Sequence, residues 1–304
     1  MRIFFMGTPE FAVASLRRLV EDGHEICGVF TQPDKPKNRG MKLTFSPVKE
    51  YALTQNLDVY QPTTMRDGEA LSILQRCAPE LVVVAAYGKI LPDDILAVAP
   101  RGSINVHSSI LPKYRGAAPI NHAILNGETE TGVTIMHMAH DLDAGDIIHI
   151  LKTPIEPTED AAQLTARLAL LGAQALSEAV RAIEDGTATR TPQDHSKQTY
   201  ASMLSREMSP VDWTRGAQDI INQIRGLIPW PCATAALGGT NFKLFSAKCA
   251  DATDAVPGTI LSAGKDGIRV ACGNGESITI TELQAEGGKR MAAADYLRGH
   301  PMQI

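Results

Sequence analysis

Short apolar runs alternate with segments of helical spacing along the first half of the chain. The expected strands cover residues 2–6, 25–31, 58–61, 81–86 and 103–107, of which residues 58–61 are short and extended rather than an apolar run. The fourth of these strands is an almost unbroken series of Leu, Val and Ala, which is typical of a strand buried on both faces of a parallel sheet. Between the runs, apolar residues recur every three or four positions, as on one face of a helix. This alternation predicts an α/β domain with a doubly wound, mostly parallel sheet.

The middle of the chain continues this pattern and then loses it. Two strands are expected over residues 131–138 and 147–155, antiparallel and joined by a polar turn. An Ala- and Leu-rich helix follows over residues 160–185, and residues 186–212 then lose periodicity and become more polar. We therefore expect a linker in this last stretch.

The last third of the chain begins with a helical pattern over residues 212–225 and then changes to short strands. These lie near residues 232–237, 241–250, 258–263, 267–272 and 277–285. Gly, Asp and Asn turns separate them, which predicts a small β-barrel of the oligonucleotide-binding (OB) kind. The expected organisation is a first domain over residues 1–188, a linker over residues 189–206 and an OB-like domain over residues 207–304.

Length and composition agree with a folded protein of two domains. The chain has 304 residues, of which 44% are hydrophobic and 21% charged, and this balance excludes a disordered chain. No apolar run approaches the ~18 residues that a membrane span needs, and no secretory leader is evident. Five cysteines without a CxxC pair argue against a disulfide framework. We expect a cytoplasmic monomer that does not bind membranes.

The charge of the chain is unevenly distributed. The net charge of −5 argues against a broad basic surface, yet residues 35–49 contain five basic side chains and no acidic one. The basic residues are Lys35, Lys37, Arg39, Lys42 and Lys49. The segment is longer than the usual 2–6 residues between a strand and a helix. It is either a solvated insertion or an arm that binds phosphate groups, and it lacks the Gly-Lys-Ser/Thr end of a P-loop.

The first turn between strand and helix reads Gly7-Thr8-Pro9-Glu10-Phe11. A dinucleotide fingerprint needs three glycines so that the pyrophosphate can approach the backbone, and only one is present. A nicotinamide or flavin enzyme is therefore not expected.

Asn105 and His107 are the first candidates for chemistry. They stand two positions apart at the carboxyl end of a predicted strand, so their side chains share a face where open α/β sheets bind ligands. An amide donor beside an imidazole could stabilise an oxyanion and move a proton. The alternative is that Asn105 orders a turn and His107 is a core histidine.

A second polar cluster covers residues 137–146 and contains several His and Asp residues. These residue types bind metals, but neither an HExxH pattern nor regular ligand spacing occurs, so no metal is expected. A carboxylate from this turn could instead orient His107 if the turn folds over the edge of the sheet. The alternative is an acidic turn in water.

Taken together, several segments resemble those of the methionyl-tRNA formyltransferase family over essentially the whole chain. They are Gly7-Thr8-Pro9, Thr31-Gln32-Pro33-Asp34, Ala86-Tyr87-Gly88-Lys89-Ile90-Leu91-Pro92, Asn105-Val106-His107, Leu111-Pro112-Lys113-Tyr114-Arg115-Gly116-Ala117-Ala118-Pro119, Leu142-Asp143-Ala144-Gly145-Asp146 and Pro229-Trp230-Pro231. The resemblance implies a Rossmann-like formyltransferase domain followed by an OB-like barrel. It implies transfer of formyl from 10-formyltetrahydrofolate to the α-amino group of methionyl initiator tRNA.

The resemblance also implies roles for individual residues. Asn105, His107 and Asp143 would be catalytic, and no metal would take part. Folate would bind at Ser109, Ile110, Leu111 and Pro112 and near Tyr87, Gly88, Ile90 and Leu91. Residues 32–48 would form the loop that contacts tRNA, through Lys35, Lys37, Arg39 and Lys42.

The chain departs from the family pattern at four positions, and none of them removes a catalytic group. Ile110 replaces a Leu, Asp141 a Gly, Ala144 a Thr and Cys232 a Gly. The alternatives are a folate-dependent formyltransferase for another amine, such as glycinamide ribonucleotide or an amino sugar, a hydrolase that releases formate, or a non-catalytic tRNA-binding protein.

Overall fold

The computed structural model describes residues 1–37 and 42–302, and the chain divides into two compact units. The first unit comprises residues 1–116, 131–153 and 165–200. The second comprises residues 117–130 and 154–164 together with the described residues from Ala201 onward. The units therefore interleave along the chain, so the expected boundaries at residues 188 and 207 stay predictions.

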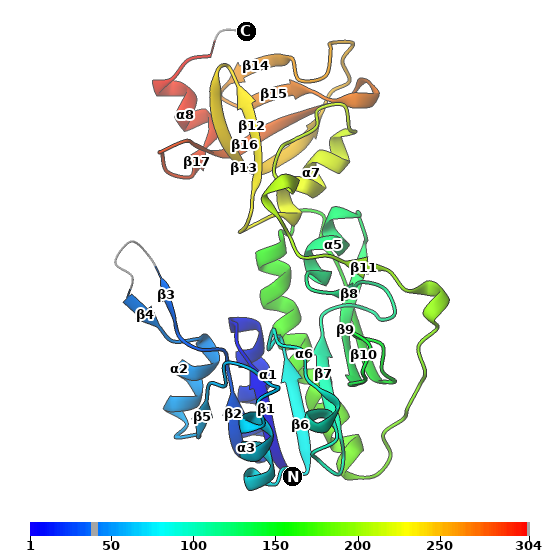
Figure 1. Ribbon diagram of the computed structural model, residues 1–304. Helices are drawn as coiled ribbons and strands as arrows, with labels where there is room; N and C mark the ends of the chain where they lie inside the picture. Colours follow the sequence, from blue (N-terminus) through cyan, green and yellow to red (C-terminus); the bar gives the residue numbers. More distant parts are fainter. Residues whose placement is uncertain (38–41, 303–304) are drawn as a thin grey trace. The chain divides into compact units, whose positions relative to one another are not determined.

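A seven-stranded sheet forms the centre of the first unit (Figure 1). Its strands are β1 (Arg2–Gly7), β2 (Glu25–Phe30), β5 (Val59–Tyr60), β6 (Leu81–Ala85), β7 (Ser103–His107), β9 (Glu130–His137) and β10 (Ile147–Pro154), in the order β10-β9-β7-β6-β1-β2-β5. β1 pairs in parallel with β2 and β6, β6 with β7 and β2 with β5, whereas β9 is antiparallel to β7. The predicted mostly parallel sheet is confirmed.

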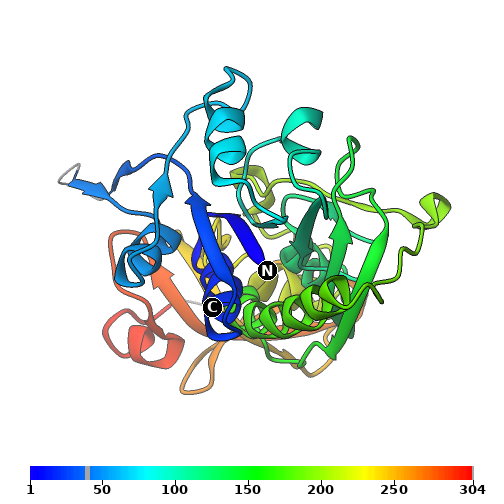
Figure 2. The same cartoon turned by 90° about the horizontal axis from the view of Figure 1, so that it is seen from below.

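Helices cover both faces of this sheet, as the unbroken apolar strand β6 predicted. They are α1 (Glu10–Glu21), α2 (Pro47–Thr54), α3 (Glu69–Cys77), α4 (Asp93–Leu96) and α6 (Ala161–Glu184). Figure 2 shows α6 along one face and α3 and α4 on the other. Gly172 of α6 faces Val106 of β7, whereas the Ser103 hydroxyl donates to the carbonyl of Leu96 in α4 at 3.0 Å. Because strand side chains alternate, Asn105 shares the face of Ser103.

The basic segment contains regular structure that the sequence did not predict. β3 (Lys35–Lys37) and β4 (Lys42–Thr44) form an antiparallel pair that extends away from the seven-stranded sheet in Figure 1. The helix that follows begins as predicted: the Ser46 hydroxyl accepts the backbone N–H of Lys49 at 3.1 Å, and Pro47 occupies the first turn.

The second unit contains an antiparallel sheet, the helices α7 and α8 that pack on it, and α5, which packs on α7. Its strands are β12 (Ala233–Leu237), β13 (Thr240–Ala250), β14 (Ile260–Gly264), β15 (Gly267–Ala271), β16 (Ser277–Ala285) and β17 (Met291–Ala292), and its helices are α5 (Pro119–Leu125), α7 (Ala217–Gly226) and α8 (Ala293–Gly299). The order is β12-β13-β16-β15-β14, with β17 beside β16. The five strands expected for the OB-like domain are all present.

One predicted helix begins later than expected. The helical pattern started at Asp212, but α7 starts at Ala217. The Asp212 carboxylate accepts both the backbone N–H and the hydroxyl of Thr214, at 3.0 and 2.7 Å, and this local turn competes with a helix.

The remaining elements are short. They are β8 (Arg115–Gly116) and β11 (Tyr200–Ala201) and the 3₁₀ turns over His195–Lys197, Arg206–Met208 and Gly273–Gly275. Within the described ranges, no helix has both the length and the apolar character that crossing a membrane requires.

Candidate active site

The structure brings His107 and Asp143 together. His107 ends β7, and Asp143 lies in the turn between β9 and β10. The imidazole Nδ1 is 3.7 Å from the carboxylate Oδ2, and the two side chains are only 6% and 10% exposed. The turn therefore folds over the edge of the sheet, and the alternative of a fully solvated acidic turn is wrong for this carboxylate.

Hydrogen bonding fixes the orientation of the His107 ring. Nε2 lies 2.9 Å from the backbone carbonyl oxygen of Tyr114. A carbonyl oxygen can only accept, so Nε2 carries the proton of this bond. The Nδ1 atom is consequently the nitrogen that faces Asp143, and it is the one that can exchange a proton with a substrate.

Asn105 lies on the same face of β7 as His107, two residues earlier. It is half-buried and stands opposite Val84 in β6 and Met136 in β9. Within the residues that the structure describes, its side-chain amide has no hydrogen-bond partner. An amide in this position remains available to donate to a bound ligand.

Contacts from distant parts of the chain hold the Asp143 turn in place. The Gly116 N–H donates to Asp143 Oδ2 at 2.9 Å. The Gln193 side-chain amide donates to the backbone carbonyls of Asp143 and Gly145, at 2.9 and 2.8 Å. A Cβ on Gly145 would lie 1.8 Å from the carbonyl oxygen of His137, so only glycine fits there. The carboxylate is thus fixed by its backbone as well as by its own bond.

Gln193 is in turn held by Arg115. The Gln193 carbonyl oxygen accepts from Arg115 Nη2 at 2.6 Å and from Nε at 3.2 Å. Arg115 Nη1 donates to Gln198 at 2.7 Å, and Nη2 lies 3.1 Å from Nδ1 of His195. These polar residues around the turn form one connected network.

Gln193, His195 and Gln198 carry no recognisable signal in the sequence. They lie in the stretch expected to be a linker, where no motif or spacing distinguishes them from other polar residues. Arg115 belongs to one of the segments that resemble the family but had no assigned role. Only the fold brings residues 193–198 beside the Asp143 turn.

The turn predicted to bind folate at residues 109–112 is rigidly anchored. Ser109 is completely buried, and its hydroxyl donates to the carbonyl of Lys113 at 2.6 Å. The Thr134 hydroxyl donates to the Ser109 carbonyl at 2.7 Å and accepts the Leu111 N–H at 3.1 Å. Leu111 is buried, Ile110 is half-buried, and the bond from Leu111 to Pro112 is cis.

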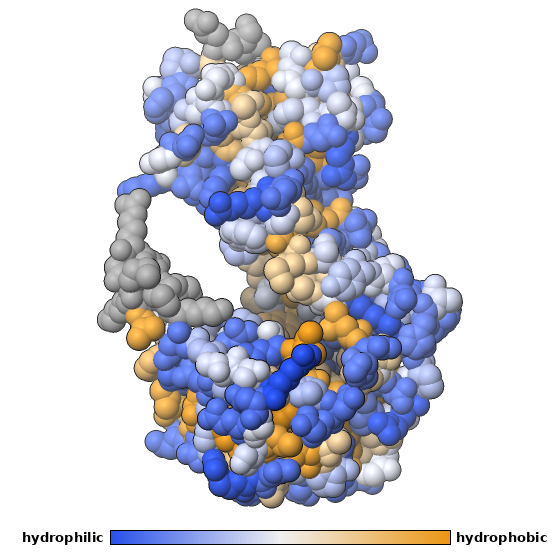
Figure 3. All heavy atoms as spheres, viewed as in Figure 1, coloured by the Kyte–Doolittle hydropathy of each residue, from blue (hydrophilic) through white to orange (hydrophobic). Residues whose placement is uncertain are grey.

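The other predicted folate segment divides between core and surface. The Tyr87 hydroxyl donates to Met65 in the core, and burial raises the pKa of this phenol above its usual value. Leu91 is also buried, whereas the Ile90 side chain is 77% exposed. Hydrophobic patches interrupt a largely polar surface in Figure 3. Because the side chains of Tyr87 and Leu91 are buried, these two residues can present only their backbone to a ligand.

Gly88 has a conformation and a neighbour that favour glycine. Its φ is +77°, and an added Cβ would lie 2.6 Å from the side-chain nitrogen of Gln32. That nitrogen donates to the carbonyls of Tyr87 and Gly88, at 3.0 and 3.2 Å.

Lys49, the basic residue of this segment whose side chain the structure describes, has a structural task. The Lys49 ammonium donates to Asp34 at 2.6 Å and to Gln61 at 2.7 Å, and it lies 4.0 Å from the centre of the Phe45 ring. The bonds from Lys49 and then Gln61 lower the pKa of the Asp34 carboxyl. Four of the five basic residues remain candidates for phosphate.

Those four residues are described to different extents. The backbones of Lys35, Lys37 and Lys42 belong to β3 and β4. Arg39 lies outside the described residues. We call residues 35–45 the basic arm.

The acidic turn between β9 and β10 does not assemble a recognisable metal site. Across residues 1–37 and 42–302, no group of three His, Cys, Asp or Glu side chains could hold a metal ion. His140 is exposed and pairs instead with Asp93 at 3.1 Å.

Comparisons with known proteins identify a family for the N-terminal part of the chain and for its C-terminal part. Residues 1–180 match the family described as formyl transferase, and residues 203–301 match the formyl transferase C-terminal domain. The methionyl-tRNA formyltransferase of Acetivibrio thermocellus is 46% identical over 304 residues, 99% of this chain and 97% of that protein. The protein of the same name in Bacillus subtilis is 46% identical over 299 residues, 98% of this chain and 94% of its own length.

Solved structures share the fold at much lower identity. The sugar 3N-formyltransferase WlaRD, solved in the presence of dTDP and 5-N-formyl-THF, superposes with a TM-score of 0.69 and 19% identity, covering 94% of this chain and 97% of that one. An N-formyltransferase from Helicobacter canadensis, with folinic acid and dTDP-3-aminofucose, gives a TM-score of 0.67 and 20% identity, covering 91% and 98%. The chain belongs to the formyl transferase family and, by its full-length similarity, to the methionyl-tRNA formyltransferases.

Proposed function

We propose that this enzyme transfers the formyl group of 10-formyltetrahydrofolate to the α-amino group of methionyl initiator tRNA. The observation that carries the proposal is the placement of Asn105, His107 and Asp143 at one end of the sheet, in a chain similar along its whole length to methionyl-tRNA formyltransferases. Because initiator tRNA is used in translation, a cytoplasmic location follows from the same proposal.

The amine must attack in its neutral form, and free α-amino groups titrate at about 7.7–8.0, so a usable fraction is neutral near pH 7. Its nitrogen bonds to the formyl carbon while the carbonyl electron pair moves onto oxygen. The Asn105 amide donates to this oxyanion, a contact that strengthens as charge develops. Removing one such donor typically lowers turnover by roughly 10²–10³-fold.

His107 manages the proton that the attacking nitrogen loses. Its Nε2 proton is committed to the Tyr114 carbonyl, so Nδ1 takes the incoming proton. Asp143, 3.7 Å away, then faces an imidazolium and stabilises its charge. The proton passes to the folate nitrogen as its bond to the formyl carbon breaks, which leaves N-formylmethionyl-tRNA and tetrahydrofolate.

Folate supplies the formyl group and leaves as an amine. The anchored turn over residues 109–112 suits a rigid ring system, because its backbone bonds to Thr134 are already made in the free protein. The exposed Ile90 side chain offers an apolar surface to such a ring. These features support the binding of a folate by this chain, as in the structurally similar formyltransferases that were solved with folate ligands.

The basic arm gives the tRNA a local electrostatic attachment. In a chain of net charge −5, phosphate groups are attracted mainly where cations are concentrated. Lys35, Lys37, Arg39 and Lys42 supply four such charges, and each neutralised phosphate releases counterions.

The test is transfer of labelled formyl to methionyl initiator tRNA. Elongator methionyl-tRNA, glycinamide ribonucleotide and an amino-sugar nucleotide serve as alternative acceptors, and release of formate without acceptor reports hydrolysis. The proposal requires the initiator to be the best substrate. Preference for another acceptor, or release of formate alone, would overturn it.

A further inference from the structure

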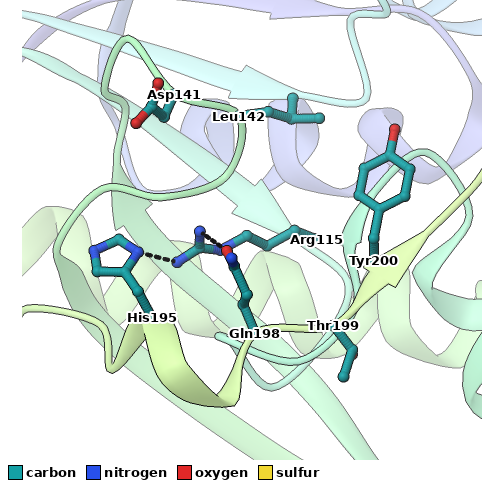
Figure 4. A pocket seen from close by; sticks show the side chains of 7 residues that line it. All are labelled: Arg115, Asp141, Leu142, His195, Gln198, Thr199 and Tyr200. Carbon is teal, nitrogen blue, oxygen red and sulfur yellow. Dashed lines mark hydrogen bonds between the residues drawn. The ribbon is translucent and has the colours of Figure 1, made fainter.

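A cleft of about 560 Å³ opens beside the Asp143 turn in the first unit (Figure 4). It is lined by Arg115, Asp141, Leu142, His195, Gln198, Thr199 and Tyr200. None of the residues that the sequence predicts to bind folate or to carry out catalysis lines it. The turn with Asp141 and Leu142 forms one wall, and the segment from His195 to Tyr200 forms the other.

Large apolar surfaces are exposed on both walls. The Leu142 side chain is 58% exposed, and Tyr200 is 65% exposed. Exposed apolar side chains scattered singly over a surface are normal, whereas those that gather at one cleft mark a binding site. An exposed aromatic ring is a common stacking surface for a nucleobase.

A buried cation lies between these walls. Arg115 is only 7% exposed, and no carboxylate within the described residues forms an ion pair with it. Its hydrogen-bond partners are the neutral amides of Gln193 and Gln198 and the imidazole ring of His195. A guanidinium whose charge is not neutralised is costly to bury, so an anion that reached the cleft would be attracted to it.

We propose that this cleft binds the 3′-terminal nucleotide of the acceptor tRNA, with the base on Tyr200 and a phosphate drawn toward Arg115. This inference rests on the proposed function. The methionyl group is esterified to the terminal ribose, so its amine and the terminal base must lie close together. Leu142 in the cleft precedes Asp143 directly in the chain, which places the nucleotide one residue away from the catalytic trio.

The volume and chemistry fit this occupant. Small-ligand sites commonly measure about 300–1,000 Å³, and a single nucleotide is of that class. Asp141, one of the departures from the family pattern, adds an acceptor for a ribose hydroxyl or a base amino group. The competing occupant is the anionic tail of folate, which would also be attracted to Arg115.

Tyr200→Ala separates these occupants, because a side chain this exposed is removed without disturbing the core. We expect its KM for methionyl-tRNA to rise by roughly 5- to 150-fold, the range for loss of one base stack, with the KM for 10-formyltetrahydrofolate unchanged. Tyr200→Phe keeps the ring and is expected to recover most of the loss. Met203→Ala, which removes another exposed side chain outside the cleft, is the matched control.

A second measurement does not depend on turnover. The trinucleotide CCA, which ends every tRNA, is titrated into the wild type and into Tyr200→Ala, and heat of binding is followed. Weaker binding of CCA by the variant supports the cleft proposal, whether or not the wild type formylates methionyl-tRNA. A wild type that does not formylate methionyl-tRNA would overturn only the proposed function. Unchanged CCA affinity and unchanged KM for methionyl-tRNA would overturn the cleft proposal, as would a rise in the folate KM alone.

Discussion

The Asp143 turn and the basic arm are both polar connections of the first unit, but the structure holds them in different ways. The Asp143 turn is bonded along its length by groups far away in sequence, Gly116 and Gln193. The basic arm is tied where it leaves and rejoins the sheet, by bonds among Asp34, Lys49 and Gln61. Contacts from distant residues position the turn, whereas in the described part of the arm β3 and β4 pair with each other and a charged cluster holds the base.

The difference matches the physical demands of the two proposed tasks. A misplacement of about 1 Å in a reacting group can reduce turnover about 100-fold, so a catalytic carboxylate needs many fixed contacts. Attraction between a cation and phosphate acts over a screening length of about 8 Å at physiological salt and tolerates loose placement. Variants in the turn should therefore change kcat, and variants in the arm should change the affinity for tRNA.

The largest effects are expected from the catalytic side chains. Asn105→Ala and His107→Ala should each reduce kcat by roughly 10²–10³-fold, because the first removes the donor to the oxyanion and the second removes the group that takes the amine proton. Steady-state formylation of methionyl-tRNA measures this loss. His140→Ala is the matched histidine control, since this ring is exposed and pairs with Asp93 away from the catalytic residues. Near-normal turnover in both active-site variants would exclude the mechanism.

Gln193 provides the next largest effect and tests positioning directly. Gln193→Glu keeps an oxygen for Arg115 but loses the amide that donates to the carbonyls of Asp143 and Gly145. We expect kcat to fall by roughly 10- to 100-fold with little change in KM, because the carboxylate of Asp143 loses its fixed position.

A split between kcat and KM distinguishes positioning from a merely structural role for Gln193. The melting temperature of Gln193→Glu should stay close to that of the wild type, since the new carboxylate pairs with a buried guanidinium. A variant with a clearly lower melting temperature, a lower kcat and a higher KM would show that Gln193 supports the fold rather than the site.

Much of the fold was predictable from local pattern. The unbroken Leu81–Ala85 strand and the Ser46-Pro47 cap carry their signals in neighbouring residues, and both elements form as expected. The pairing of His107 with a carboxylate of the β9–β10 turn could be predicted only on the condition that this turn folds over the edge of the sheet, and the sequence does not show in which direction it folds.

Other features depend on contacts that no local pattern encodes. Gln193 bonds to a turn 50 residues earlier, and in the sequence it is one polar residue among many. Lys49 was counted in the basic segment 35–49 because charge counts do not show pairing, whereas the fold brings Asp34 and Gln61 to its ammonium. Asp212 read as helical because apolar spacing hides the competing bond to Thr214.

The basic arm should show smaller, salt-dependent effects. Lys37→Ala or Lys42→Ala should raise the KM for tRNA a few-fold, leave the folate KM unchanged and reduce the slope of log affinity against log salt by about 1. Lys49→Met is the informative control, because its ammonium is engaged by Asp34 and Gln61 and should contribute nothing to this slope. An equal reduction by Lys49→Met would contradict the assignment of Lys49 to structure.

The smallest effect concerns stability at the base of the arm. The Lys49 and Gln61 bonds lower the pKa of Asp34 in the folded protein, so the charged carboxylate contributes stability above the unfolded pKa of about 3.9. This contribution is lost as the pH falls through the lower, folded pKa, and it should be below about 1 kcal/mol because water reaches the pair. Asp34→Asn should therefore melt slightly below the wild type at pH 7 and converge with it in acid. Curves that stay parallel across this pH range would show that the ion pair adds no net stability, leaving Gln61 to hold the base of the arm.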